Sequence, residues 1–245
     1  MTARSLERLR ELAALGAQAC EFDVAEPARV REVVPPGATV LHSVPALVGE
    51  QGPFEATPAI VEAMKNRPRR VVYLSTTGVY GSTEEVDETT AINPNTPRAL
   101  LRALAESAVE AGPWESLILR PAAIYGPGRG VHVAMPAARY RLLGDGSNYV
   151  SRIHVDDLAA ISAAALGSAL QGAYPVADAH PSTSAEIAEW VGTLLGVPVI
   201  RGERPESLSE TRRSNRRVDG SAVLRELGVG LKYPSYREGI PASLT

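Results

Sequence analysis

Leu74-Ser75-Thr76-Thr77-Gly78-Val79-Tyr80-Gly81 is the most informative segment of this 245-residue chain. The apolar run Val71-Val72-Tyr73 precedes it, and its length and β-branched residues predict a buried strand. Open α/β sheets bind ligands at the carboxyl ends of such strands. Hydroxyl side chains at this position therefore predict a ligand site.

Strand-like and helix-like segments alternate on both sides of this segment. This alternation is typical of an α/β protein with a parallel sheet covered by helices on both faces. We expect a core over residues 1–125 and a smaller, substrate-side lobe over residues 126–245. Strands are expected at 17–22, 38–44, 70–75, 116–120 and 173–177, and helices at 5–16, 27–34, 57–65, 98–111, 156–166, 184–196, 221–227 and 236–244.

Local signals predict how several of these helices begin and which side they bury. Ser5 is expected to cap the first helix, with Leu6, Leu9 and Leu12 on one face. Asp156 or Asp157 is expected to cap the helix over 156–166. Leu101, Leu104, Ala105 and Ala108 share one side of the helix over 98–111, and Thr183 to Glu186 form a capping box.

Composition excludes several functional classes. Apolar residues make up 44 % of the chain, which suits a folded protein with a full core. The net charge of −3 and the 5 % of aromatic residues argue against nucleic-acid binding. No apolar run approaches the length of a membrane helix, and the first residues resemble no signal peptide, so we expect a cytoplasmic protein. The single cysteine, Cys20, is expected to be a small buried residue.

Several segments together resemble the extended short-chain dehydrogenase/reductases, which include NAD-dependent epimerases and dehydratases. The best fit is an atypical branch of bacterial YeeZ-like proteins. The resemblance covers essentially the whole chain. It rests on Asp23 and on segments 75–81, 120–128, 153–159 and 174–178, in the family's order.

The resemblance implies an unusual active site. In the family a Ser or Thr binds the substrate oxygen, a Tyr passes the proton, and a Lys four residues later holds the cofactor ribose. This sequence aligns Thr76 with the Ser/Thr, Arg98 with the Tyr and Arg102 with the Lys. Arginine stays charged and cannot pass a proton. Arg102 is therefore expected to hold a ribose or phosphate, with two solvated arginines at 98 and 102 as the alternative. Tyr80 is expected to replace the proton donor, with Tyr125 as the other candidate.

The resemblance also implies NAD or NADP as cofactor, a small-molecule substrate and no metal. Arg4 favours NADP, because the family uses an arginine there for the ribose phosphate. Asp23 has an alternative explanation as a helix cap, and His154 with Asp156 resembles a metal pair only superficially. The residues implied to bind the cofactor are Arg4, Asp23, His42, Ser43, Val44, Ser75, Pro121 and Ala122.

The family's glycine-rich phosphate loop has no counterpart in this sequence. We therefore expect a Rossmann-like sheet that lacks its first βαβ unit. Either the start of the sequence lies too late in the gene, which we prefer, or the protein is a natural truncation that repacks or forms a homodimer. Both explanations predict weak or absent dinucleotide binding.

Two functions remain open at this stage. The first is an atypical NAD(P)-dependent oxidoreductase or epimerase-like enzyme. The second is a non-catalytic module that binds a nucleotide or another ligand. Arg212, Arg213, Arg216 and Arg217 form a basic cluster that is expected to be a solvated loop, with binding of a substrate phosphate as the alternative.

Overall fold

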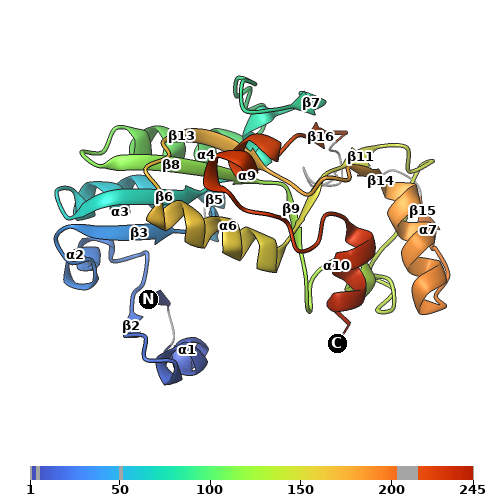
Figure 1. Ribbon diagram of the computed structural model, residues 1–245, viewed down its shortest axis with the longest axis horizontal. Helices are drawn as coiled ribbons and strands as arrows, with labels where there is room; N and C mark the ends of the chain where they lie inside the picture. The colour runs from blue at the N-terminus through green and yellow to red at the C-terminus, as the bar shows by residue number, and fades with distance from the viewer. Residues whose placement is uncertain (1, 4–5, 50–51, 203–214, 245) are drawn as a thin grey trace.

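The computed structural model describes residues 2–3, 6–49, 52–202 and 215–244. Its centre is a four-stranded parallel sheet in the order β13-β8-β6-β3 (Figure 1). The strands are β3 (Ala38–His42), β6 (Pro68–Leu74), β8 (Glu115–Pro121) and β13 (Gly172–Val176). The predicted α/β class with a Rossmann-like parallel sheet is confirmed.

Successive side chains of a strand point to opposite faces of the sheet. Helices cover both faces, so both sets of side chains are buried. Val71 and Tyr73 of β6 belong to the cluster that contains Ile60 and Met64 of α3 (Thr57–Met64). Val72 belongs to the opposite cluster, with residues of α6 (Val155–Gly167) and α9 (Ser221–Leu227). Each such side chain contributes about 1.5–3 kcal/mol by leaving water.

Helix α4 (Pro97–Glu110) buries charged residues that the sequence analysis did not place in the core. Thr96 caps it, since its Oγ1 accepts a hydrogen bond from the Ala99 amide at 3.2 Å. The prediction that Leu104 lies on the buried side is wrong, because its side chain is 60 % exposed. Arg102 and Glu106, four residues apart, lie on the buried face instead, where each has an ionic partner.

The N-terminal segment differs from its prediction. The single helix expected over 5–16 is a 3₁₀ turn, η1 (Leu6–Leu9), followed by α1 (Arg10–Ala14), and Leu12 is exposed. Ser5, the predicted cap, lies outside the described residues. The strand expected over 17–22 is only β2 (Cys20–Glu21), which pairs with β1 (Thr2–Ala3) in a separate ladder. Cys20 is only partly buried, contrary to expectation.

The chain beyond residue 126 builds a second core and also completes the first. β9 (Ala123–Tyr125) follows β8 and pairs with β12 (Arg152–His154). Residues of α7 (Ser184–Leu195) and α10 (Tyr236–Ala242) pack on Tyr125 and Leu142. β13 belongs to the central sheet, and α6 and α9 pack on it, so the chain returns to the first core after residue 126. The predicted division there stays a prediction.

Of two predicted helix caps, the one of α6 is wrong and the one of α7 is confirmed. At the start of α6, His154 Nδ1 accepts from the Asp156 amide at 3.1 Å, while Asp157 accepts from the amides of Lys232 and Tyr233. Thr183 does cap α7, with its Oγ1 accepting from the Glu186 amide at 3.0 Å.

No helix within the described ranges combines the length and apolar character needed to span a membrane. The remaining described elements are short. They are η2 (Pro27–Arg29), α2 (Val30–Val33), β4 (Leu47–Gly49), β5 (Gly52–Phe54), η3 (Thr77–Tyr80), β7 (Glu85–Val86), α5 (Val131–Ala134), β10 (Leu142–Leu143), β11 (Tyr149–Val150), β14 (Ser182–Thr183), β15 (Arg201–Gly202) and β16 (Arg217–Val218).

Candidate functional site

The carboxyl ends of β3, β6 and β8 lie at one edge of the sheet, because the strands are parallel neighbours. This edge brings together many of the residues predicted from the sequence. His42 ends β3, and Ser75 and Thr76 follow β6. Pro121 ends β8, and Ala122 follows it. The segment that follows β3 adds Ser43, which is exposed, and Val44, which is half-buried.

Arg102 is buried beneath this edge rather than exposed on it. Its side chain is 5 % exposed, and Nη1 donates to the Val44 carbonyl at 3.0 Å and to Glu55 Oε2 at 2.9 Å. Nη2 donates to the Leu74 carbonyl. Arg102 thereby connects α4 to the chain just after β3 and to the end of β6. Arg98, one turn earlier, is exposed.

His42 belongs to the same buried cluster. Its Nε2 lies 2.9 Å from Thr57 Oγ1, which in turn donates to Glu55 Oε1 at 2.6 Å. The ring stacks on Tyr73, with centroids 5.4 Å apart. Burial, together with the nearby Arg102 cation, lowers the pKa of His42 to about 4, so the imidazole is neutral at physiological pH.

Ser75 and Tyr80 are connected through a buried ion pair. Ser75 Oγ donates to Glu106, whose carboxylate pairs with Arg120 at 2.8 Å. Arg120 Nη1 donates to the Tyr80 hydroxyl at 3.1 Å. The Tyr80 ring is fully buried, and burial raises the pKa of its hydroxyl despite the adjacent guanidinium.

Thr76 is the most accessible hydroxyl of the predicted catalytic set. It is half-buried in extended backbone, and its Oγ1 accepts from the Gly78 amide at 3.1 Å. The following turn is held by Arg216, whose guanidinium donates to the carbonyls of Thr77, Gly81 and Thr83. The expectation that Arg216 lies in a solvated loop is therefore wrong, while Arg212 and Arg213 lie outside the described residues.

Two of the predicted cofactor-binding residues are not part of this cluster. Asp23 is exposed, and its Oδ1 accepts from the Ala25 amide at 2.9 Å in a local turn. Arg4 lies outside the described residues, so its predicted preference for NADP stays a prediction.

A cavity of about 150 Å³ lies beside this edge, in the C-terminal lobe. Ala123, Ile124 and Tyr125 of β9 line it, together with Arg152 of the neighbouring strand β12. The sequence analysis did not identify Arg152. The only available signal was a charged residue within a short strand-like segment before a helix.

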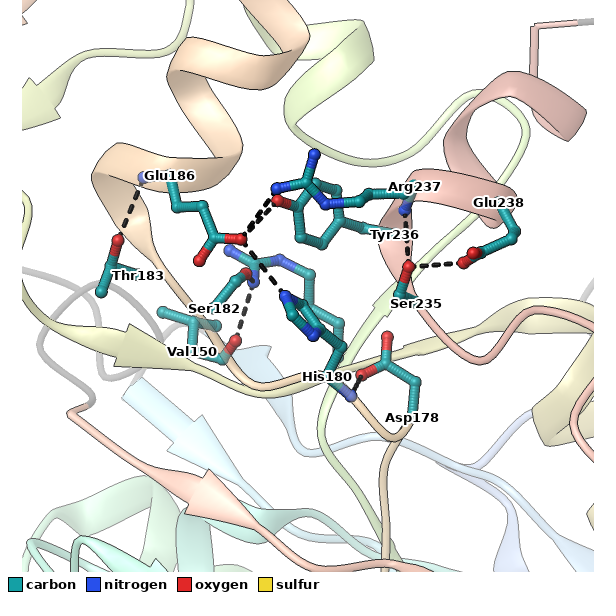
Figure 2. Close-up of polar contacts among 11 residues, drawn as sticks. Val150, Asp178, His180, Ser182, Thr183, Glu186, Ser235, Tyr236, Arg237 and Glu238 are labelled. Atoms are coloured by element: carbon teal, nitrogen blue, oxygen red, sulfur yellow. Dashed lines mark hydrogen bonds and ion pairs between the residues drawn. The ribbon is translucent and has the colours of Figure 1, made fainter.

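Polar side chains of the same lobe form a hydrogen-bonded cluster, which Figure 2 shows. Glu186 Oε1 accepts from Tyr236 at 2.8 Å and pairs with Arg237 at 3.1 Å and His180 at 3.2 Å. These three partners belong to α10 and to the loop before β14, so the Glu186 carboxylate connects them to α7. Within the described ranges no group of three or more His, Cys, Asp or Glu side chains is placed to hold a metal.

Asp178 follows β13 and is another residue that the sequence analysis did not select for the site. Its side chain is buried, Oδ1 accepts from the His180 amide at 3.2 Å, and Oδ2 has no hydrogen-bond partner among the described residues. Burial raises the pKa of this carboxyl to about 7. A buried carboxyl of this kind titrates near neutrality and is a candidate acid or base.

Comparisons with known proteins agree with this architecture. Residues 8–177 match the NAD dependent epimerase/dehydratase family. A functionally unknown conserved protein from Silicibacter pomeroyi is 31 % identical, with a TM-score of 0.80 over 99 % of this chain and 88 % of that chain. A comparison with curated proteins found no match.

More distant structures share the fold. UDP-glucuronic acid 4-epimerase from Bacillus cereus, in complex with UDP-glucuronic acid and NAD, is 16 % identical, with a TM-score of 0.75 over 97 % of this chain and 84 % of that chain. MoeE5 in complex with UDP-glucuronic acid and NAD is 19 % identical, with a TM-score of 0.77 over 93 % and 84 %. Because the family match covers more than half of its length, the chain belongs to the NAD-dependent epimerase/dehydratase family.

Proposed function

We propose that this protein is an atypical NAD(P)-dependent enzyme of the epimerase/dehydratase type that acts on a small molecule. The observation that carries the proposal is the gathering of His42, Ser75, Thr76, Pro121 and Ala122 at one edge of the parallel sheet. Ligands of open α/β sheets bind at this edge. The cofactor would lie across the strand ends, with the substrate toward the lobe cavity.

Family membership and the fold neighbours support the choice of ligand. The UDP-glucuronic acid 4-epimerase and MoeE5 structures hold NAD and a UDP-sugar. We extend NAD and a sugar-like substrate to this chain as part of the proposal. The preference for NADP rests on Arg4 alone.

Thr76 is the residue we propose to contact the substrate oxygen. Its Oγ1 already accepts a hydrogen bond from the Gly78 amide, and a hydroxyl has a single proton to donate. That proton has no acceptor among the described residues, so Thr76 can donate it to a substrate carbonyl or hydroxyl.

Arg102 and Tyr80 are better supported as positioning residues than as groups that touch the cofactor or substrate. The Arg102 guanidinium is engaged by Glu55 and two strand-end carbonyls. Tyr80 is fully buried, and its raised pKa opposes the loss of a proton at neutral pH. Both residues hold the strand ends and the turn that carries Thr76.

A non-catalytic ligand-binding protein of the same fold is the second candidate. Two arginines favour it. Arg98 replaces the family's tyrosine and is exposed, and Arg102 replaces the family's lysine and is paired with Glu55. Such a protein would bind the dinucleotide or another ligand without turning it over.

Calorimetric titration of the chain with NAD, NADH, NADP and NADPH tests the proposal first. We expect dinucleotide binding, followed by turnover of UDP-glucose or UDP-glucuronic acid that Thr76→Val lowers at least tenfold. The matched control is Thr89→Val, at an exposed threonine of a loop outside the edge. Binding without turnover selects the second candidate. A folded protein that binds none of the four dinucleotides refutes the NAD(P)-dependent enzyme and leaves the second candidate only with a ligand that is not a dinucleotide.

A further inference from the structure

We propose that the cavity of the C-terminal lobe binds an oxyanion of the substrate, a carboxylate or a phosphate, and that Arg152 recognises it. The inference deepens the proposed function, because it rests on this cavity being the substrate side of that site. It names a chemical class of substrate and the residue that selects it.

The guanidinium of Arg152 is buried, and no carboxylate among the described residues lies within ion-pairing distance of it; Asp178 is the acidic residue whose charge acts on it most strongly. The residue is 7 % exposed, and Nη1 donates to the Val150 carbonyl and to Ser182 Oγ, each at 2.7 Å. Among the described residues, Nε and Nη2 form no hydrogen bond and no carboxylate pairs with the side chain. Burying an unpaired charge is costly, so a ligand that supplies the missing charge is strongly favoured.

Three other buried arginines of the same chain provide an internal comparison; a fourth, Arg216, donates to backbone carbonyls as described above. Arg70 pairs with Glu115, Arg102 with Glu55 and Arg120 with Glu106. Each of these side chains stabilises the fold through a neighbouring carboxylate. Arg152 has carbonyl and hydroxyl partners only, and it differs from them again in lining a cavity.

The nearby carboxylates compensate the charge of Arg152 only in part. Glu186 is held by Arg237, His180 and Tyr236, as Figure 2 shows. Asp178 attracts the Arg152 cation but forms no direct ion pair with it. The Nε and Nη2 donors of Arg152, which have no partner among the described residues, are therefore left for a ligand.

The cavity lining suits an anion attached to a compact organic body. Its described lining contains two arginines, Arg141 and Arg152, and no aspartate or glutamate. Much of the remaining wall is apolar, including Ile124, Leu143 and Ile240. A guanidinium with two free donor positions binds a carboxylate or phosphate through paired hydrogen bonds, whereas a neutral hydroxyl gains much less.

The test uses D-glucuronate, D-glucose 6-phosphate and D-glucose as probes, measured by calorimetry and ligand-observed NMR on the full chain. We expect at least one anionic probe to bind at least tenfold more tightly than D-glucose, and the better of the two identifies the oxyanion. Arg152→Met should abolish this preference, and Arg152→Lys should retain part of it. The control Arg139→Met, at an exposed arginine of the same lobe, should leave binding unchanged.

A stability measurement separates recognition from a purely structural role. If Arg152 serves the ligand, unliganded Arg152→Met should unfold in urea at the wild-type midpoint or above it, because a buried unpaired charge is removed. A clearly lower midpoint, equal binding of D-glucose, or no binding of either anion at 10 mM by the wild type overturns the inference. Dinucleotide titrations are scored separately: loss of NAD binding with retained anion binding refutes the proposed function alone.

Discussion

Asp178 and His42 are buried titratable residues with shifted pKa values, raised for Asp178 and lowered for His42. Their contributions to stability should therefore change with pH in opposite directions. The carboxyl of Asp178 has a raised pKa of about 7, so the folded state retains its proton where the unfolded state loses it. Stability is therefore lost as the pH rises from about 4 to about 7 and then levels off.

Asp178→Asn should remove this loss. Urea unfolding at pH 8 should show the variant gaining about 1–4 kcal/mol relative to wild type, with little gain at pH 4. Asp219→Asn, at an exposed aspartate beyond β16, is the control and should show no such difference. An equal effect of Asp178→Asn at both pH values would contradict the raised pKa.

His42 should make the wild type sensitive to acid. Its pKa is about 4 in the folded protein, so between pH 6.5 and 4 the imidazole is protonated in the unfolded state but mostly neutral in the folded state. Stability contributed by neutral His42 is present above that range and is lost as the pH falls through it. His42→Gln should reduce the loss between pH 7 and 4 by about 2–3 kcal/mol, measured by urea unfolding. His180→Gln, at an exposed histidine, is the control.

At the scale of elements, Arg102 connects α4 to Glu55, just before α3, and to the carbonyls of Val44 after β3 and Leu74 at the end of β6. Arg102→Met leaves the Glu55 carboxylate, 2 % exposed, without its counter-ion. Loss of one partner of a buried pair costs about 3–5 kcal/mol. Arg98→Met, one turn earlier and exposed, should change the unfolding free energy by less than about 0.5 kcal/mol. If Arg102→Met also costs less than about 1 kcal/mol, the pair does not hold these elements together.

The turn after η3 requires glycine at position 81. Gly81 has φ of +61°, and a Cβ there would lie 2.0 Å from the Asn93 carbonyl oxygen. Gly144 has a similar φ of +60° but open space around it. Gly81→Ala should therefore lower the unfolding free energy well beyond Gly144→Ala, whose cost is the left-handed backbone alone, about 1 kcal/mol. Similar costs for the two variants, measured by urea unfolding, would show that the loop around Asn93 moves aside.

At the scale of the whole molecule, β3 is the outer strand of the four-stranded sheet as far as the chain is described. Val48 and Phe54 of the adjoining β4–β5 hairpin are 84 % and 43 % exposed. Exposed strand edges and apolar side chains promote association. We therefore still expect a homodimer, detectable by light scattering as twice the 26.0 kDa chain mass and weakened by Val48→Glu. A monomer at 100 μM would exclude it.

The main sheet and its helices were largely predictable, because periodicity and β-branched runs act locally. The expected segments at 38–44, 70–75 and 116–120 correspond to β3, β6 and β8. The alternation of strands and helices predicted that these strands run parallel. Predictions based on single polar residues were less successful. Asp156 and Asp157 looked like caps, yet His154 caps α6 and Asp157 instead accepts from amides 75 and 76 residues away.

The sequence by itself determined the α/β class, the family resemblance and the strand end that carries Thr76, because these follow from neighbouring residues. Only the tertiary structure decided which charges are paired. Glu55 and Arg102 lie 47 residues apart in the sequence but form an ion pair. That the Arg152 guanidinium donates only to a carbonyl and a hydroxyl also follows from the folded structure alone. Burial and ionic pairing depend on contacts between distant segments, which no local pattern records.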